Sequence, residues 1–374
     1  MKRSYLVAAG LAAVLAGLVL AGCGGSSKTN TNTNTTAASN FTAGLVSDIG
    51  KFNDKGFNQN QLAGLKKAKS QLGIKILEEQ SNSSSDYLPN MTTEIRQGAN
   101  IVSAAGYLLA PTVAKLASQF PKVDFTITDD SVSPSSFDFS KKAFKADHAK
   151  YYTKNIEGLV YASNESGCLV GYLAGEMVKA KGGKQVIGAT GGIEIPAVDD
   201  YIVGYNYCAK LADPGIKVLV GYSNDFVAQD KCKTLAQDQI GQGSQVEFQV
   251  AGGCGLGTLN AAAQAGIWGI GVDVDQYSLA KNVLTSALKR VDTGIFTADQ
   301  QAEQGHFKGG SDLLFDLRNN GVGVGTISPK VPAALVTKMN QLEAKIKSGQ
   351  IHVPVAAGSD LLGLLPGAKV GPTH

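Results

Sequence analysis

The chain has 374 residues, a formal net charge of +3 and hydrophobic residues at 43% of its positions. The small charge, without a basic run that contains interleaved aromatic residues, argues against a nucleic-acid-binding surface. A chain of this length can bury two hydrophobic cores of ordinary domain size, so we expect two lobes.

The first residues have the pattern of a signal peptide. Lys2 and Arg3 precede an apolar stretch that runs from Leu6 to Leu20. A membrane-spanning helix would need roughly 20 apolar residues, so this stretch is short for one. We therefore expect residues 1–22 to be a lipoprotein signal peptide.

The motif Leu20-Ala21-Gly22-Cys23 resembles the bacterial lipobox, in which the cysteine thiol is acylated and becomes the first mature residue. A buried structural cysteine is the alternative. Acyl chains stabilise membrane attachment by about 0.8 kcal/mol per buried CH₂. They would hold the protein on the extracytoplasmic face of the cell membrane, with residues 23–40, rich in Ser, Thr and Asn, as a flexible tether.

Four further cysteines are present, at Cys168, Cys208, Cys232 and Cys254. An exported chain permits disulfides, and four cysteines allow three pairings between which the sequence does not choose. A zinc site is the alternative. However, no C-x-x-C spacing occurs and the histidines lie far from these cysteines, so we expect no metal.

From Phe41 onward, short apolar runs alternate with helical stretches, which predicts mostly parallel sheets of α/β type. The first strand is expected at 44–47, and an amphipathic helix follows at about 58–71. Further strands, apolar enough to be buried on both faces, are expected at 74–78, 101–105, 124–128, 185–189, 217–221, 246–250 and 268–272.

A helix at 165–180 starts a second series of such units, which sets a lobe boundary near residue 155. Later elements are a strand at 283–291 and helices at 302–318 and 334–348, and the tail from residue 358 has no clear pattern. The expected lobes are 41–155 with about 280–322, and 156–279 with about 323–374.

Ligands of open α/β sheets bind beyond the carboxyl ends of the strands, so two facing sheets form a cleft walled by strand-end loops. The first such loop offers Asp48, Asn53, Phe57 and Asn58. Hydrogen-bonding groups beside a flat apolar ring suit a heterocycle, because stacking on one aromatic ring contributes about 1–3 kcal/mol. Alternatively, Asn53 or Asp54 caps the helix and Phe57 lies in the core.

The second lobe offers corresponding loops. Phe226 follows the strand at 217–221 and is placed to close on a ring opposite Phe57, with burial in the core as the alternative. Gly252 and Gly253 open a helix, where backbone can approach a ligand closely. Their segment lacks the Lys-Ser/Thr ending of a P-loop and does not fit G-x-G-x-x-G, so we expect no cofactor.

Asp273 ends another strand, and Lys289 lies at an expected lobe crossing. A carboxylate there can accept from two vicinal hydroxyls of a sugar, to which the lysine can donate. The alternative is a helix cap at Asp273 and a surface salt bridge for Lys289.

Five segments in this order, 53–58, 191–196, 249–257, 271–276 and 285–292, resemble the basic membrane protein family, the PnrA-like purine-nucleoside-binding lipoproteins of ABC importers. The resemblance covers nearly all of residues 42–355. It implies the type I periplasmic-binding-protein fold, with two Rossmann-like lobes joined by three crossovers around a hinged cleft.

The resemblance also implies site roles. Phe57 and Phe226 would sandwich the base, and Asp48 and Asn58 would bond its polar edge. Backbone of the glycine pair would approach the ligand.

Asp273 and Lys289 would hold the ribose hydroxyls in the same comparison. One position departs from the family, since Pro111 stands about where an Asp usually touches the base. Tyr107, Asp129 and Asp130 are candidates to compensate.

These observations predict a monomeric solute-binding lipoprotein that captures a nucleoside, preferably a purine, by lobe closure and delivers it to an ABC permease and its ATPase. A sensor or receptor lipoprotein for a sugar or another small effector is the alternative, since a fold does not fix function. A nucleoside hydrolase fits less well, because no nucleophile turn such as G-x-S-x-G is present.

Overall fold

The computed structural model describes residues 39–132, 137–138, 143–144 and 153–374. The predicted signal peptide, the predicted lipidation site Cys23 and nearly all of the predicted tether lie outside the described residues. Within the described part, no helix combines the length and apolar character that crossing a membrane requires.

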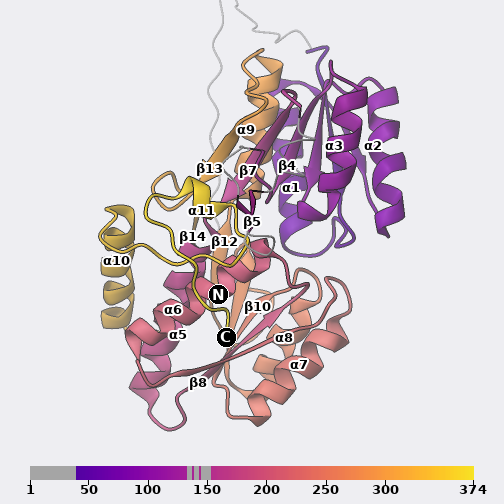
Figure 1. The fold of residues 1–374 in the computed structure, drawn as a ribbon. Helices are drawn as coiled ribbons and strands as arrows, with labels where there is room; N and C mark the ends of the chain where they lie inside the picture. Colours follow the sequence, from indigo (N-terminus) through magenta and orange to yellow (C-terminus); the bar gives the residue numbers. More distant parts are fainter. Residues whose placement is uncertain (1–38, 133–136, 139–142, 145–152) are drawn as a thin grey trace, which may run out of the picture. The chain divides into compact units, whose positions relative to one another are not determined.

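The first lobe is built on a six-stranded parallel sheet with the order β13-β7-β4-β3-β1-β2. All residues of three central strands, β1, β3 and β7, are buried because helices cover both faces of the sheet. The strands are β1 (Thr42–Ser47), β2 (Lys75–Glu79), β3 (Ile101–Ala105), β4 (Asp124–Thr128), β7 (Ile156–Tyr161) and β13 (Asp312–Phe315). Helices α1 (Phe57–Leu72) and α9 (Val291–Glu303) cover one face, and α2 (Tyr87–Arg96) and α3 (Ala110–Gln119) cover the other (Figure 1).

The second lobe repeats this plan with the order β14-β12-β11-β10-β8-β9, in which only β14 runs antiparallel. The strands are β8 (Val186–Gly191), β9 (Lys217–Tyr222), β10 (Val246–Val250), β11 (Trp268–Asp273), β12 (Val283–Lys289) and β14 (Val322–Val324). Helices α5 (Ser163–Lys181) and α6 (Pro196–Ala212) cover one face, and α7 (Gln229–Gly241) and α8 (Gly255–Ala265) cover the other. The predicted α/β fold of two lobes is confirmed.

Smaller elements complete the described chain: η1 (Ser84–Asp86), η2 (Tyr107–Leu109), the pair β5 (Phe137–Asp138) and β6 (Ala143–Phe144), α10 (Ala333–Lys347) on α5, and α11 (Leu361–Leu364). The tail, which has no clear sequence pattern, contacts both lobes: Asn206 in α6 donates to the Pro372 carbonyl at 3.3 Å, and Asp360 accepts from the Ser131 N–H at 2.8 Å. Asn164 in α5 donates to the carbonyl of Val353 at 3.0 Å, and Val355 forms a parallel bridge with Val370.

The chain passes between the sheets three times: after β7, after β12, and between β13 and β14. β7 pairs with β4 in the first lobe, and β12 pairs with β11 in the second. The expected lobe boundaries near residues 155 and 280 therefore each fall one strand too early. Pairing partners decide which sheet a strand joins, and the order of elements along the chain does not reveal them.

The helix expected at 302–318 is wrong. Helix α9 begins directly after β12, and β13 occupies the second half of the expected range. Gly305 and Gly310 adopt left-handed φ angles of 70° and 81°, which interrupt helical backbone between the two elements.

Two disulfides resolve the pairing that the sequence left open. Cys168–Cys208 joins α5 to α6, with Cα atoms 4.9 Å apart, and Cys232–Cys254 joins α7 to the residue before α8, with Cα atoms 5.6 Å apart. Across the described ranges, no group of three or more His, Cys, Asp or Glu side chains is arranged to hold a metal ion.

Candidate ligand-binding site

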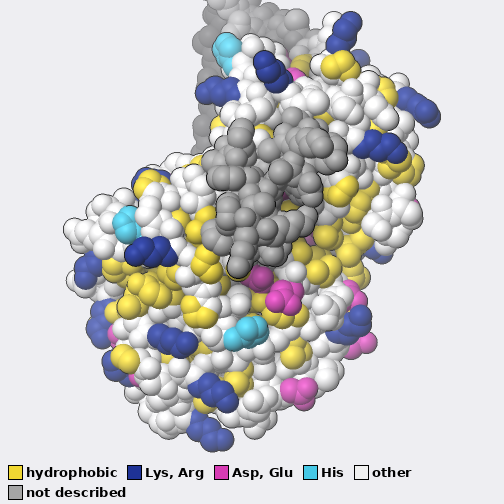
Figure 2. Space-filling model, in the orientation of Figure 1, with side chains coloured by type: hydrophobic (Ala, Val, Ile, Leu, Met, Phe, Trp, Pro, Cys, Tyr) yellow, Lys and Arg dark blue, Asp and Glu magenta, His cyan; other side chains and the backbone are white. Residues whose placement is uncertain are grey.

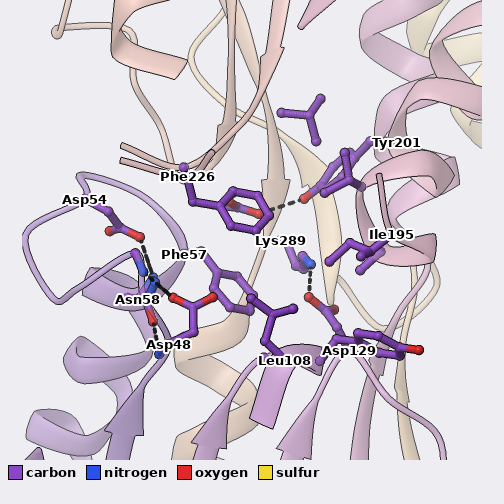
Figure 3. Close-up of a pocket in the computed structure, with 18 residues that line it drawn as sticks. Asp48, Asp54, Phe57, Asn58, Leu108, Asp129, Ile195, Tyr201, Phe226 and Lys289 are labelled. Atoms are coloured by element: carbon purple, nitrogen blue, oxygen red, sulfur yellow. Dashed lines mark hydrogen bonds and ion pairs between the residues drawn. The ribbon is translucent and has the colours of Figure 1, made fainter. Parts of the chain in front are cut away.

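A pocket with an empty volume of about 580 Å³, open solvent included, lies at the carboxyl ends of strands from both sheets (Figure 3). Its lining combines apolar and aromatic side chains with four carboxylates and one ammonium. The lining residues are Asp48, Gly50, Asp54, Phe57, Asn58, Gly106, Tyr107, Leu108, Asp129, Ile195, Ala197, Val198, Tyr201, Phe226, Val250, Gly252, Asp273 and Lys289.

Asp54 shapes the first wall of the pocket. Its carboxylate accepts hydrogen bonds from three backbone N–H groups at the start of α1, those of Gly56 (2.9 Å), Asn58 (2.8 Å) and Gln59 (3.1 Å). These bonds satisfy donors that a helix start leaves unpaired. The capping role considered for Asp54 is thus present, while Phe57 is half-buried and lines the pocket.

Asn58 connects two of the carboxylates. Its Nδ2 donates to Asp48 Oδ1 at 2.8 Å and to Asp54 Oδ2 at 3.2 Å, and its Oδ1 accepts from the Asp48 N–H at 3.3 Å. Burial raises the pKa of Asp48 to about 7, although hydrogen bonds from Gly50 and Asn58 oppose that rise. Burial also raises the pKa of Asp54. Asn58 therefore fixes the positions of both acids.

Lys289, the last residue of β12, forms the cationic part of the site. Its Nζ lies 2.6 Å from Asp129 Oδ2, with side-chain exposures of 3% for Lys289 and 9% for Asp129. The ammonium also lies 4.9 Å from the ring centroid of Phe57 and 5.5 Å from that of Tyr201, which is within range of a cation–π attraction. Burial raises the pKa of Asp129, and the charge of Lys289 limits that rise.

Asp129 and Asp273 occupy corresponding places in the two lobes. Asp129 directly follows β4, Asp273 ends β11, and both have a left-handed φ of 64°. Asp tolerates this conformation better than most residues, and it turns the chain sharply at the strand end. Asp273 Oδ1 accepts from the Tyr201 hydroxyl at 3.1 Å, and burial raises the pKa of Asp273 to about 6.

Phe226 lies in the loop after β9 and lines the pocket. Phe57 of the other lobe lines the same pocket (Figure 3). Glycines make room for Phe226. A Cβ added at Gly192 would lie 2.3 Å from a ring carbon of Phe226, which is too close for any side chain. Gly252 has a left-handed φ of 54°, and a Cβ there would meet the Phe226 carbonyl oxygen at 3.4 Å.

The structure brings most of the predicted site residues together. Those that line the pocket are Asp48, Phe57, Asn58, Phe226, Gly252, Asp273 and Lys289. Asn53 is exposed and is not a lining residue, because the loop turns its neighbour Asp54 inward as the cap of α1. Gly253 is buried beside Asp54 and likewise does not line the pocket.

The structure also places the candidates to compensate for Pro111 and shows one lining tyrosine that the sequence did not indicate. Of the candidates to compensate for Pro111, Tyr107 and Asp129 line the pocket and Asp130 does not; Pro111 itself is exposed on α3. Asp129, like Asp273, is an acidic residue at the end of a strand, and this sequence pattern could have predicted it as a site residue. The sequence did not indicate Tyr201, because this residue lies within helix α6, and a tyrosine on the apolar face of a helix is expected to be buried in the core.

Chemically, the lining offers four carboxylates and aromatic surface, and Lys289 is its single basic residue. This set can bind an uncharged ligand that carries several N–H or O–H donors beside a flat ring. On the molecular face drawn in Figure 2, by contrast, Lys and Arg side chains are spread over the surface.

The chain is similar to known proteins along most of its length. A sequence model of the Bmp family, described as ABC transporter substrate-binding protein PnrA-like, matches residues 41–357. A CD4+ T-cell-stimulating antigen of Listeria monocytogenes is 29% identical, covering 94% of this chain and 99% of the relative. The ABC transporter nucleoside-binding protein BmpA of Lactococcus lactis is 28% identical with the same coverage, and basic membrane protein A1 of Borrelia garinii is 31% identical over 83% of this chain and 87% of the relative.

Among solved structures, an ABC transporter solute-binding protein from Aeropyrum pernix shares the fold with a TM-score of 0.72 at 21% identity, covering 83% of this chain and 92% of that chain. A solute-binding protein from Conexibacter woesei matches with a TM-score of 0.64 at 22% identity, covering 84% and 99%. The chain therefore belongs to the PnrA-like family of ABC transporter substrate-binding proteins.

Proposed function

We propose that this protein captures a nucleoside, preferably a purine nucleoside, between its lobes and delivers it to an ABC permease driven by an ATPase. One observation carries the proposal: Phe57 of the first lobe and Phe226 of the second line one pocket together with buried hydrogen-bond acceptors. A flat base between two rings gains stacking energy on both faces, about 1–3 kcal/mol for each ring.

The polar groups divide into two sets. Asp48, held by Asn58, accepts from the donor edge of the base, while Asp273 and Lys289 bind the ribose hydroxyls. The fixed positions of these groups favour this division, because Tyr201 orients Asp273 and Asp129 orients Lys289. A preorganised site loses little conformational entropy when the ligand binds.

The charge of the lining favours a nucleoside over a nucleotide. A phosphate group would bring negative charge close to Asp48, Asp54, Asp129 and Asp273, with Lys289 alone to offset it. Like charges in a desolvated site repel strongly. The name of the L. lactis relative, a nucleoside-binding protein, supports the same ligand class.

We further propose that the mature protein is a monomer that binds without chemistry and is held on the outer face of the cell membrane by lipid on Cys23. Mass spectrometry of the membrane fraction would detect the acyl groups, and an unmodified mature N-terminus would contradict the anchor. Release of free base during prolonged incubation with a nucleoside would contradict a role in binding alone.

Calorimetric titration of the purified protein with adenosine, guanosine, inosine and cytidine tests the ligand class. We expect saturable one-to-one binding of at least one purine nucleoside. An absence of heat and of saturation for all four at millimolar concentration would refute the proposed ligand.

A further inference from the structure

The Cys232–Cys254 disulfide lies directly behind the Phe226 loop. Cys232 is in the first turn of α7, Cys254 immediately precedes α8, and both side chains are fully buried. The bond joins the segment that carries Phe226 to the segment that carries Gly252. Both of these residues line the ligand pocket.

Cys254 also contacts the Phe226 loop directly. The Cys254 N–H donates to the Phe226 carbonyl oxygen at 3.0 Å, and the Cys254 sulfur lies 2.9 Å from the carbonyl oxygen of Ala228. The helices behind these residues approach closely, since a Cβ at Gly257 would lie 1.9 Å from the Gln229 carbonyl oxygen. Displacement of Cys254 would therefore displace the Phe226 peptide.

Hydrogen bonds also hold the loop: the N–H groups of Ser223 and Asn224 donate to the carbonyl oxygens of Gly191 and Gly192, each at 2.9 Å. Asp225 accepts from the N–H groups of Val227 and Ala228 and pairs with Lys231, whose side chain is 55% exposed. Exposed pairs of this kind contribute little to stability. The Phe226 ring is only half-buried, and beside these hydrogen bonds the disulfide is a covalent tie between the segment that follows Phe226 and the body of the lobe.

We infer that the Cys232–Cys254 disulfide is a positioning element of the ligand site, which holds Phe226 in place for stacking. The inference rests on the proposed function in one respect, that Phe226 contacts the ligand. Cys168–Cys208 provides a comparison, because it is equally buried but joins α5 to the last part of α6, about two helical turns beyond Tyr201, the nearest lining residue of that helix.

The first test needs no ligand. Hydrogen exchange is measured by mass spectrometry on the full chain and on the variants C232A/C254A and C168A/C208A. We expect faster exchange at 223–228 and 251–255 in C232A/C254A only. Unchanged exchange there, or an equal change in both variants, would overturn the inference. C232V/C254A, which fills the space left by one sulfur, is used if C232A/C254A does not fold.

The second test measures the effect on binding. Inosine is titrated into the wild type, C232A/C254A, F226A and the triple variant. Immobilisation of one side chain corresponds to roughly a two- to ten-fold change in affinity, so C232A/C254A should bind that much more weakly. In the F226A background, loss of the disulfide should change affinity by less than about two-fold, because the two changes act through the same contact.

Unchanged affinity in C232A/C254A, or full additivity with F226A, would refute the positioning role. Equal weakening by C168A/C208A would show that loss of either disulfide acts through general stability, which also contradicts the inference. If the wild type binds no nucleoside, the proposed function fails, and the exchange measurement alone decides the inference.

Discussion

The ammonium of Lys289 lies 2.6 Å from the carboxylate of Asp129, and the two residues belong to different lobes. Asp129 follows β4 of the first sheet, and Lys289 ends β12 of the second. The pair therefore connects the lobes at the floor of the pocket while it presents a cation to the ligand.

Replacement of Asp129 by Asn should lower the free energy of unfolding by up to about 3–5 kcal/mol, because it removes the carboxylate paired with the buried Lys289 ammonium and leaves Asp273 as the remaining acid that interacts with it. Glu176→Gln is the matched control. It removes the carboxylate of the Lys338–Glu176 pair, which has a similar distance of 2.8 Å but a lysine that is 50% exposed, and should cost about 0–1 kcal/mol. Urea unfolding followed by circular dichroism measures both, and equal losses would contradict the structural importance of the Asp129–Lys289 pair.

Truncation of either ring should weaken nucleoside binding. Phe57→Ala and Phe226→Ala each remove one stacking surface, worth about 1–3 kcal/mol, which corresponds to roughly a 5- to 150-fold rise in the dissociation constant. Phe296→Ala, at a half-buried phenylalanine of α9 outside the pocket, controls for the loss of a ring and should leave the constant unchanged. If the three variants bind equally well, the rings do not hold the ligand.

The Phe226 ring depends on Gly192. Gly192→Ala would place a methyl group 2.3 Å from the ring, so the ring must move and affinity should fall about as far as in Phe226→Ala. At Gly241, the last residue of α7, an added Cβ meets no atom within 4 Å. Gly241→Ala should therefore leave calorimetric affinity intact. Unchanged affinity in Gly192→Ala would show that the position of the Phe226 ring does not matter for binding.

Binding should depend on pH through Asp48. Its pKa is raised to about 7, so below that pH the free protein holds Asp48 neutral. Inosine presents an N–H at its base edge, and an ionised carboxylate is the better acceptor. Affinity for inosine should therefore rise as the pH increases from 6 to 8.

Asp48→Asn should remove most of this pH dependence. A residual slope near pH 6 is expected from Asp273, whose pKa is raised to about 6. Titration calorimetry at several pH values separates the two contributions. An unaltered profile in Asp48→Asn would assign the pH dependence to another group.

The site residues at strand ends were predictable, because in a parallel sheet the carboxyl ends of the strands converge on one edge. That rule identified Asp48, Phe226 and Asp273. Tyr201 escaped it, since it reaches the pocket from within a helix and depends on how α6 packs. Asn53 lies outside the pocket lining, because the cap on α1 decides which residue of this polar loop turns inward.

The choice of partner strands accounts for the remaining differences in the fold. The order of elements predicted two α/β lobes, but it did not reveal that β12 pairs with β11 or that β13 pairs with β7. The first pairing joins consecutive strands, and the second joins strands that lie far apart along the chain. The disulfide partners of Cys168 and Cys232 belong to the same class of information, because only the packing of helices brings each thiol to its partner.

A crystal structure of the full-length protein grown with inosine would test the central claim most directly. We expect the base to lie between the rings of Phe57 and Phe226, with its donor edge on Asp48 and its ribose hydroxyls on Asp273 and Lys289. An empty pocket at saturating inosine, or a nucleoside bound away from these rings, would contradict the account.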